Sequence, residues 1–188
     1  MDEILLLTRA FAFAAEKHAH QRRKGESAEP YVNHLAEVAH LLAVAVHGRD
    51  ANLVAAGLLH DTLEDTETTW DELATTFNED IAGLVSEVTD DKSLPKQERK
   101  RLQVEHAPSR TDRAKMLKLA DKTSNLRGIV ASPPAGWSVQ RRLEYVKWGR
   151  DVAAGLRGVH PWLEAQFDEA ADTAERVVRA ASSADRKG

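Results

Sequence analysis

The sequence predicts an all-α protein, a single helical bundle without a substantial sheet. Three observations support this prediction. Apolar residues recur at three- and four-residue spacing along nearly all of the 188 residues, no convincing period-two alternation marks a strand, and the loops are too short for a confident domain boundary. We therefore expect one helical domain over residues 1–181, followed by a frayed tail over residues 182–188.

The first expected helix covers residues 4–17, where Ile4 begins an apolar face with helical spacing. Residues 21–29 follow as a polar loop with a basic start. Pro30 suits the first turn of the second helix, since proline lacks the N–H that a first turn leaves unpaired. Asp50 can cap a third helix, which the apolar pattern extends without interruption through Leu63.

Turn and capping residues mark the remaining helices. Thr69 stands three residues before Glu72, the spacing of a capping box, and Asn78 can cap the helix that follows. The later expected helices cover residues 96–105, residues from 112 through 126, residues 139–156 and residues 161–181, with a clear break at residues 133–136.

Composition excludes several classes of protein. The net charge of −4 gives no overall attraction to nucleic acid or to an anionic membrane. The absence of cysteine excludes disulfides, thiolate zinc sites and a thiol nucleophile. No apolar run approaches the ~20 residues of a membrane helix, and the acidic start does not resemble a signal peptide. We expect a cytoplasmic protein without nucleic-acid or membrane partners; the sequence does not indicate its oligomeric state.

The most informative segment is residues 58–66, where four polar side chains interrupt an apolar helical pattern. His60 and Asp61 are adjacent, and Glu64 and Asp65 follow four residues after each of them. On one continuous helix Glu64 would lie under His60, and Asp65 under Asp61. Buried charge is costly unless it is paired or metal-bound, so the segment indicates the floor of an active site. A solvated helix end is the alternative for the two acidic residues alone.

Two other expected helices supply further metal ligands. His34 lies on the helix after Pro30, and Asp121 lies on the helix that begins at Asp112. With His60 and Asp61 they make a nitrogen–oxygen set that suits manganese, iron or zinc. A lone histidine is more often a core or surface residue, but the joint pattern favours a metal. Such a metal can lower the pKa of bound water and polarise a phosphoryl oxygen.

Several motifs flank these ligands. They occupy residues 23–24, 30–34, 59–66, 88–92, 95–96, 98–105, 118–122 and 125–127, with Trp137, Glu144, Tyr145 and Trp148. In these motifs the chain resembles the HD metal-dependent phosphohydrolases, and among them the hydrolase domain of RelA/SpoT-type alarmone enzymes. The small stand-alone hydrolases of the metazoan SpoT homologue type are most similar. The resemblance covers roughly residues 5–160, with Thr123-Ser124 as a departure from the bulkier pair usual in the family.

The resemblance implies removal of the 3′-pyrophosphate from ppGpp or pppGpp, giving GDP or GTP, with one divalent metal. Manganese is the metal that it implies, with zinc or iron as alternatives. The roles that it implies are metal binding by His34, His60, Asp61 and Asp121, handling of the attacking water by Glu64 and Asp65, substrate positioning by Asn125, and a nucleotide and phosphate pocket lined by Arg23, Lys24, Lys96, Arg141 and Tyr145.

Without the resemblance, the default interpretation of these basic residues is solvated charge. On the helix of residues 96–105 only about half of the cations can face one direction, so Lys96 could share a face with Arg99 or Lys100 while the rest face solvent. An aromatic pair at three-residue spacing is more often core than a base-stacking surface. We therefore expect Trp148 in the core, while a ligand contact of Tyr145 is implied only by the resemblance.

Three alternative functions remain open at the level of sequence. Removal of the 2′-phosphate from NADPH is a close rival, because both substrates present a ribose phosphate beside a base. A non-catalytic alarmone sensor would be favoured by loss of a metal ligand or of the acidic pair, and all are present. A two-metal phosphodiesterase or an HD oxygenase would need further histidine ligands, and His40, His47 and His106 lie in no matching motif.

Overall fold

The computed structural model describes the backbone of residues 2–185 and the side chains of residues 2–181. Within that part of the chain the all-α prediction is confirmed, and the β-type pairings are two isolated bridges, Arg22 with Pro30 and Gly25 with Pro134. The helices are α1 (Glu3–Lys17), α2 (Val32–Ala45), α3 (Ala51–Leu59), α4 (Thr62–Asp65), α5 (Trp70–Thr76), α6 (Glu79–Val88), α7 (Lys96–His106), the 3₁₀ turn η1 (Ala107–Ser109), α8 (Asp112–Ala131), α9 (Val139–Ala154) and α10 (Pro161–Asp185).

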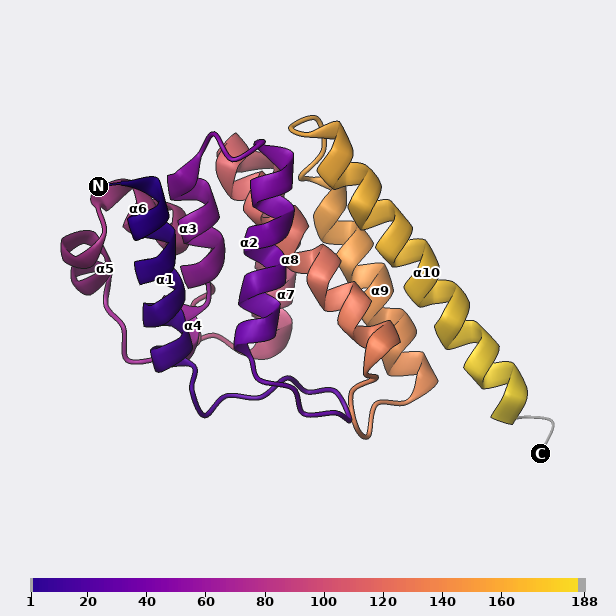
Figure 1. The fold of residues 1–188 in the computed structure, drawn as a ribbon. Coiled ribbons are helices and arrows are strands. Elements are labelled where there is room, and N and C mark those ends of the chain that lie inside the picture. Colours follow the sequence, from indigo (N-terminus) through magenta and orange to yellow (C-terminus); the bar gives the residue numbers. More distant parts are fainter. Residues whose placement is uncertain (1, 186–188) are drawn as a thin grey trace.

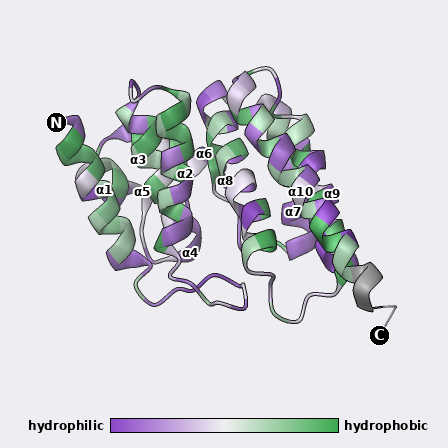
Figure 2. Cartoon of the chain, turned by 45° about the vertical axis from the view of Figure 1, so that its right-hand side comes forward, coloured by the Kyte–Doolittle hydropathy of each residue, from purple (hydrophilic) through white to green (hydrophobic). Residues whose placement is uncertain are grey.

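Helix α8 lies at the centre of the bundle. It contacts α2, α3 and α6, and also α9 and α10, while α1, α3 and α2 lie side by side at the other end of the molecule (Figure 1). The buried apolar side chains form one continuous core, and hydrophilic and hydrophobic residues alternate along α2 and α10 (Figure 2). The polar residues of α8 from Lys118 to Ser124 are also buried. Buried polar groups need partners, so this stretch marks the site.

The predicted N-caps are confirmed. Asp50, Thr69 and Asn78 each accept a hydrogen bond from the backbone N–H three residues later, which pairs a donor that the first helical turn leaves free. Pro30 differs from the expectation, because α2 begins at Val32 and Pro30 precedes it in the bridge to the loop.

The helix that the sequence predicted to continue through Leu63 is interrupted. Helix α3 ends at Leu59 and α4 begins at Thr62, with His60 and Asp61 in a turn between them. The Thr62 hydroxyl donates to the Leu59 carbonyl at 2.6 Å, so a side chain uses an oxygen that a continued helix would offer to a backbone N–H. The prediction of one continuous helix was wrong, and uniform helical spacing does not set the geometry of this segment.

Helix α10 is longer than expected. It continues to Asp185, so residues 182–185 of the expected frayed tail are helical, while residues 186–188 lie outside the described residues. None of the described helices combines the length and the apolar character that crossing a membrane requires.

Candidate metal centre and its cavity

The four predicted metal ligands converge from three parts of the fold: α2 carries His34, the turn after α3 carries His60 and Asp61, and α8 carries Asp121. Nε2 of His34 lies 3.4 Å from Asp121 Oδ1 and 3.7 Å from Asp61 Oδ2. Nε2 of His60 lies 3.0 Å from Asp61 Oδ2 and 3.8 Å from Asp121 Oδ1. Candidate ligand atoms of His34, His60 and Asp121 all lie within 4.8 Å of one another, close enough for one divalent cation to be shared.

The two imidazoles have the orientation that a metal requires. Nδ1 of His60 lies 2.9 Å from the carbonyl oxygen of Gly57, which only accepts, so Nδ1 donates its proton there. Nδ1 of His34 lies 2.8 Å from the hydroxyl of Ser124. Both Nε2 atoms are buried and have no hydrogen-bond partner among the described residues. A cation fits these residues, because it would supply the partner that each nitrogen lacks.

The electrostatics of the cluster also favour a cation. Burial opposes the charged form of His60, yet the carboxylates of Asp61 and Asp121 raise its pKa to about 10. Burial lowers the pKa of His34, and the neighbouring His60 lowers it further. Burial would raise the pKa of Asp61, but the charge of His60 holds it well below the usual range. A divalent cation would replace the proton on His60, so metal binding is expected to release a proton.

Each carboxylate of the cluster is held by a donor side chain. The Tyr31 hydroxyl donates to Asp61 Oδ2 at 2.6 Å. Asn125 Nδ2 donates to Asp121 Oδ1 at 2.6 Å, and the Lys122 ammonium lies 3.1 Å from Oδ2. Burial raises the pKa of Tyr31, and Asp61 raises it further, so the phenol remains a donor. Asn125, predicted to position the substrate, thus lies directly beside a candidate ligand.

Glu64 lies in a half-buried position beside the cluster. Its Oε2 accepts from the backbone N–H of Asp90 at 3.3 Å, and its Oε1 lies 3.5 Å from Nη1 of Arg99. Burial raises the pKa of Glu64, and the nearby charges of Asp90 and Asp61 raise it further. A carboxylate with a raised pKa is a better proton acceptor near neutral pH than an ordinary one.

Asp65 has a different pair of partners. Its Oδ2 accepts from Nε2 of Gln21 at 2.8 Å, and its Oδ1 pairs with the ammonium of Lys92. Both acidic residues have donor partners, but Glu64 also lies near the carboxylates of Asp90 and Asp61, which raise its pKa. The two neighbouring acidic residues have distinct environments and are suited to distinct tasks.

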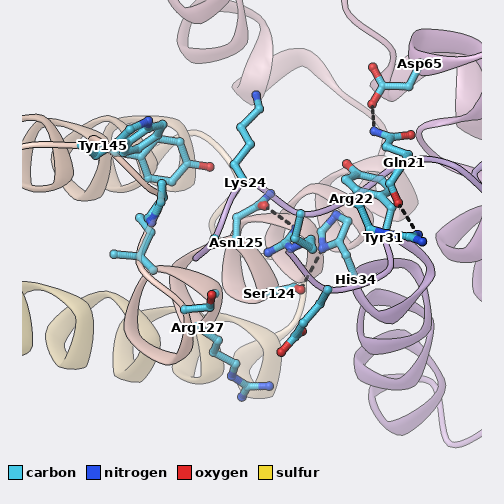
Figure 3. A pocket seen from close by; sticks show the side chains of 18 of the residues that line it. Gln21, Arg22, Lys24, Tyr31, His34, Asp65, Ser124, Asn125, Arg127 and Tyr145 are labelled. Atoms are coloured by element: carbon cyan, nitrogen blue, oxygen red, sulfur yellow. Dashed lines mark hydrogen bonds between the residues drawn. The ribbon is translucent and has the colours of Figure 1, made fainter. Parts of the chain in front are cut away.

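A cavity of about 790 Å³ opens beside the candidate metal ligands. This volume is in the range of small-molecule binding sites. Figure 3 shows Tyr145 pointing into it from one side, with His34, Tyr31 and Asp65 on the other. The predicted catalytic and substrate residues that line it are Arg23, Lys24, Glu64, Asp65, Lys96, Asn125, Arg141 and Tyr145.

Several cations also line the cavity, among them Lys24, Lys96, Lys100 and Arg141. Burial lowers the pKa of Lys96, and the charges of Arg141 and Lys24 lower it further. Burial also lowers the pKa of Lys100, with added repulsion from Lys96. Like charges held this close indicate a place for a polyanion, which would relieve the repulsion.

Helix α7 presents one basic face to the cavity, as the helical spacing predicted. Lys96, Arg99 and Lys100 all line the cavity. Arg101 instead pairs on the exposed side with Glu98 and Glu105, three and four residues away. Arg99 and Lys100, which the sequence left as alternatives, both belong to the cavity wall.

An aromatic group forms part of the same wall. The rings of Tyr145 and Trp148 have centroids 5.3 Å apart, and those of Trp137 and Tyr145 are 5.6 Å apart. The guanidinium of Arg141 lies 4.4 Å from the Trp137 ring centroid. Trp148 is only partly buried and lines the cavity, with its Nε1 donating to the Lys100 carbonyl. The assignment of Trp148 to the core was therefore incomplete, since its ring also faces the cavity.

Arg23 is held against α8. Its Nη1 donates to Asn125 Oδ1 at 3.1 Å, so the amide links it to Asp121. A Cβ atom at Gly128 would lie 2.6 Å from Nη2 of Arg23, so glycine leaves room for the guanidinium. Contacts with α8 therefore restrain the orientation of this guanidinium.

Sequence reasoning missed three polar residues that orient the site. Tyr31 lies three residues before His34, and that helical spacing could have indicated it. Ser124 belongs to the pair noted as a departure from the family pattern, and its hydroxyl contacts both Nδ1 of His34 and, at 2.6 Å, Oε2 of Glu37. The departure thus affects a candidate ligand as well as packing. No local pattern indicated Gln21, because its contact is 44 residues away.

A helical bundle that gathers two histidines and two aspartates around one candidate cation site is typical of a class of metal-dependent domains. Residues 10–146 match the family described as HD domain, so the chain belongs to the HD-domain family. Within it, the chain is 50% identical to the guanosine-3′,5′-bis(diphosphate) 3′-pyrophosphohydrolase MESH1 of Xenopus tropicalis, over 89% of this chain and 93% of that protein. The Homo sapiens protein of the same name is 49% identical, over 87% of this chain and 91% of that one.

A solved structure gives the same result. The structure described as a metazoan ortholog of SpoT that hydrolyzes ppGpp matches this fold with a TM-score of 0.85 and 45% identity. The match covers 88% of this chain and 93% of that chain.

Proposed function

We propose that this protein removes the 3′-pyrophosphate from guanosine tetraphosphate or pentaphosphate, giving GDP or GTP and pyrophosphate. The Xenopus tropicalis and Homo sapiens relatives are named for this activity, and the structural neighbour is described as hydrolysing ppGpp. One observation carries the proposal. A single cavity lies beside the candidate metal ligands and is also lined by basic and aromatic side chains.

The shape and charge of the cavity support such a substrate. A guanosine with phosphates at both 3′ and 5′ positions has two separate anionic groups joined by the ribose, which also carries the flat base at C1′. The 3′ end would lie at the metal cluster, and the 5′ end at Lys24, Lys96 and Arg141. Tyr145 would contact the nucleoside, and Arg23 would reach phosphate beside Asn125.

His34, His60, Asp61 and Asp121 would hold one divalent metal, which we propose is manganese, with zinc or iron as alternatives. When bound, the metal would lower the pKa of water and polarise a phosphoryl oxygen. Asn125 would hold Asp121 in place and position substrate beside it.

We assign Glu64 as the general base, because burial and neighbouring carboxylates raise its pKa. Glu64 takes a proton from the attacking water as the water oxygen bonds to the phosphorus on the ribose 3′ oxygen. The bond from that phosphorus to the 3′ oxygen breaks, pyrophosphate leaves, and the 3′ oxygen takes a proton from solvent. Asp65, held by Gln21 and Lys92, orients the water or contacts the substrate.

A substrate panel on metal-stripped protein tests the proposal. Manganese, zinc, iron and magnesium are added back one at a time, and turnover of ppGpp, pppGpp and NADPH is compared with that of a generic phosphodiester. We expect manganese-dependent release of pyrophosphate from ppGpp. Faster turnover of NADPH would favour the 2′-phosphatase, and tight ppGpp binding without turnover would favour the sensor. Either result, or ppGpp turnover no better than the generic ester, contradicts the proposal.

The continuous helical pattern and the absence of a signal-peptide pattern lead us to propose one catalytic domain over residues 1–181 and a cytoplasmic location.

Metal-to-protein stoichiometry near one in the substrate panel would support a single-metal site. A stoichiometry near two would instead favour the two-metal phosphodiesterase.

A further inference from the structure

A buried histidine outside the metal cluster begins a hydrogen-bond chain that ends on Asp65. His18, directly after α1, is 3% exposed, and its Nδ1 lies 2.5 Å from Oε1 of Gln21. Nε2 of Gln21 donates to Oδ2 of Asp65 at 2.8 Å, beside the cavity (Figure 3). We propose, on the basis of the function proposed above, that His18 and Gln21 are positioning residues for Asp65 in the hydrolytic step.

The chemistry of the three groups fixes the direction of this chain. A carboxylate only accepts, so Gln21 must present its NH₂ group to Asp65 and its carbonyl oxygen to His18. A carbonyl oxygen also only accepts, so His18 donates from Nδ1. A neutral imidazole with its proton on Nδ1 is sufficient. Moving that proton to Nε2 would break the bond to Gln21, and flipping the Gln21 amide would break its bond to Asp65.

The backbone of this loop has hydrogen bonds of its own, apart from the side-chain chain. The backbone N–H of Gln21 donates to the His18 carbonyl at 3.0 Å, and the Gln21 carbonyl accepts from Tyr31 at 3.1 Å. Nε2 of His18 is buried without a hydrogen-bond partner among the described residues. An apolar side chain would fill this position without that desolvation cost, so retaining an imidazole points to a role for Nδ1.

The two oxygens of Asp65 are held unequally. Gln21 is partly buried and its amide oxygen is hydrogen-bonded to His18, so the amide that donates to Oδ2 is held in one orientation. The partner of Oδ1 is Lys92, whose side chain is 48% exposed. An exposed ion pair exchanges readily with solvent. Oδ1 is therefore the oxygen available to water or substrate, and Gln21 sets its direction.

Kinetics of the manganese-loaded full-length protein with ppGpp test the positioning role. Gln21→Ala is expected to lower kcat about tenfold, as loss of a partner behind an active-site group commonly does, with KM and bound metal unchanged. His18→Ala should reproduce part of that loss. The matched control is His20→Ala, an exposed histidine two residues away, which should leave kcat unchanged.

A double-mutant cycle separates positioning from general damage. In an Asp65→Ala background, Gln21→Ala should cause no further loss, because no carboxylate remains to be positioned. An undiminished tenfold loss in that background would overturn the role, as would wild-type kcat in Gln21→Ala.

A measurement without substrate keeps the two proposals distinguishable. Long-range ¹H–¹⁵N spectra of the metal-free protein should show His18 with its proton on Nδ1, and this signal should shift in Asp65→Ala. A proton on Nε2 alone would overturn the positioning role. Failure of the wild-type protein to hydrolyse ppGpp would instead overturn the proposed function.

Discussion

The two walls of the cavity are built on different foundations. We call the candidate ligands His34, His60, Asp61 and Asp121 the metal wall, of which His34 lines the cavity, and residues 96–106 of α7 the substrate wall. The metal wall belongs to helices α2 and α8 and to the turn directly after α3, and the apolar residues of these three helices form part of the core. The substrate wall belongs to a helix with no buried residue, held by polar contacts such as Arg99 to Glu64 and Trp148 Nε1 to the Lys100 carbonyl.

The two walls therefore differ in how firmly the fold holds their side chains. A metal needs ligand atoms at fixed distances, and helices packed into a core hold them because moving them would disrupt packing. A polyanionic substrate needs charge at a suitable place, which exposed lysine and arginine side chains supply with less rigidity. We therefore expect changes in the metal wall to abolish function and changes in the substrate wall to reduce affinity.

The largest expected effect is at His34 in the metal wall. His34→Ala removes a candidate ligand. The affinity for the metal should fall by more than the ~10- to 100-fold that follows loss of a group hydrogen-bonded to a ligand. Bound metal and activity should be lost together. Elemental analysis of the purified protein gives the measurement. His40→Ala, an exposed histidine on the same helix, is the control and should retain both. Unchanged metal content in His34→Ala would remove it from the site.

The next effect is at Glu64, between the two walls. Glu64→Gln keeps the shape but removes the base, so kcat should fall by about 10²- to 10⁴-fold while bound metal stays constant. Steady-state kinetics alongside Glu67→Gln, an exposed neighbour, provides the comparison. A wild-type kcat in Glu64→Gln would assign proton removal to another group.

A smaller effect is expected in the substrate wall. Lys96→Gln should raise KM about tenfold, since a charge-assisted hydrogen bond contributes roughly 1.5–3 kcal/mol, and should leave metal content unchanged. Arg101→Gln, on the same helix but paired on its outer side with Glu98 and Glu105, should leave KM unchanged. Equal effects of the two substitutions would mean that α7 acts through overall charge and not through its cavity face.

The smallest effect concerns pH. Burial and the charge of Asp90 raise the pKa of Glu64 above its ordinary 4.5. The pH profile of kcat should therefore have an acidic limb, on which kcat falls as the pH decreases, and this limb should lie above pH 4.5. Asp90→Asn removes a repelling charge, lowers the pKa of Glu64, and should move that limb to lower pH. Asp91→Asn, at the exposed neighbouring position, should not. A limb that moves to higher pH would contradict the assignment of Glu64 as the base.

Much of the fold could be predicted because its signals are local. Helical periodicity and the caps Asp50, Thr69 and Asn78 depend on residues three or four apart, and each is confirmed. The helix break after Leu59 could not be predicted, because the apolar pattern continues from Leu59 through Leu63. The Thr62 hydroxyl competes for the Leu59 carbonyl only in the folded conformation.

The sequence by itself determined the fold class and the four candidate ligands, because residue type and helical spacing restrict both strongly. Only the tertiary structure decided which partners orient the site residues: Ser124 at the candidate ligand His34, Tyr31 at the candidate ligand Asp61, and Gln21 at Asp65, the residue expected to handle water. These contacts join residues 30 to 90 positions apart. Helical periodicity places a residue on a face, but the packing of separate helices decides what that face meets.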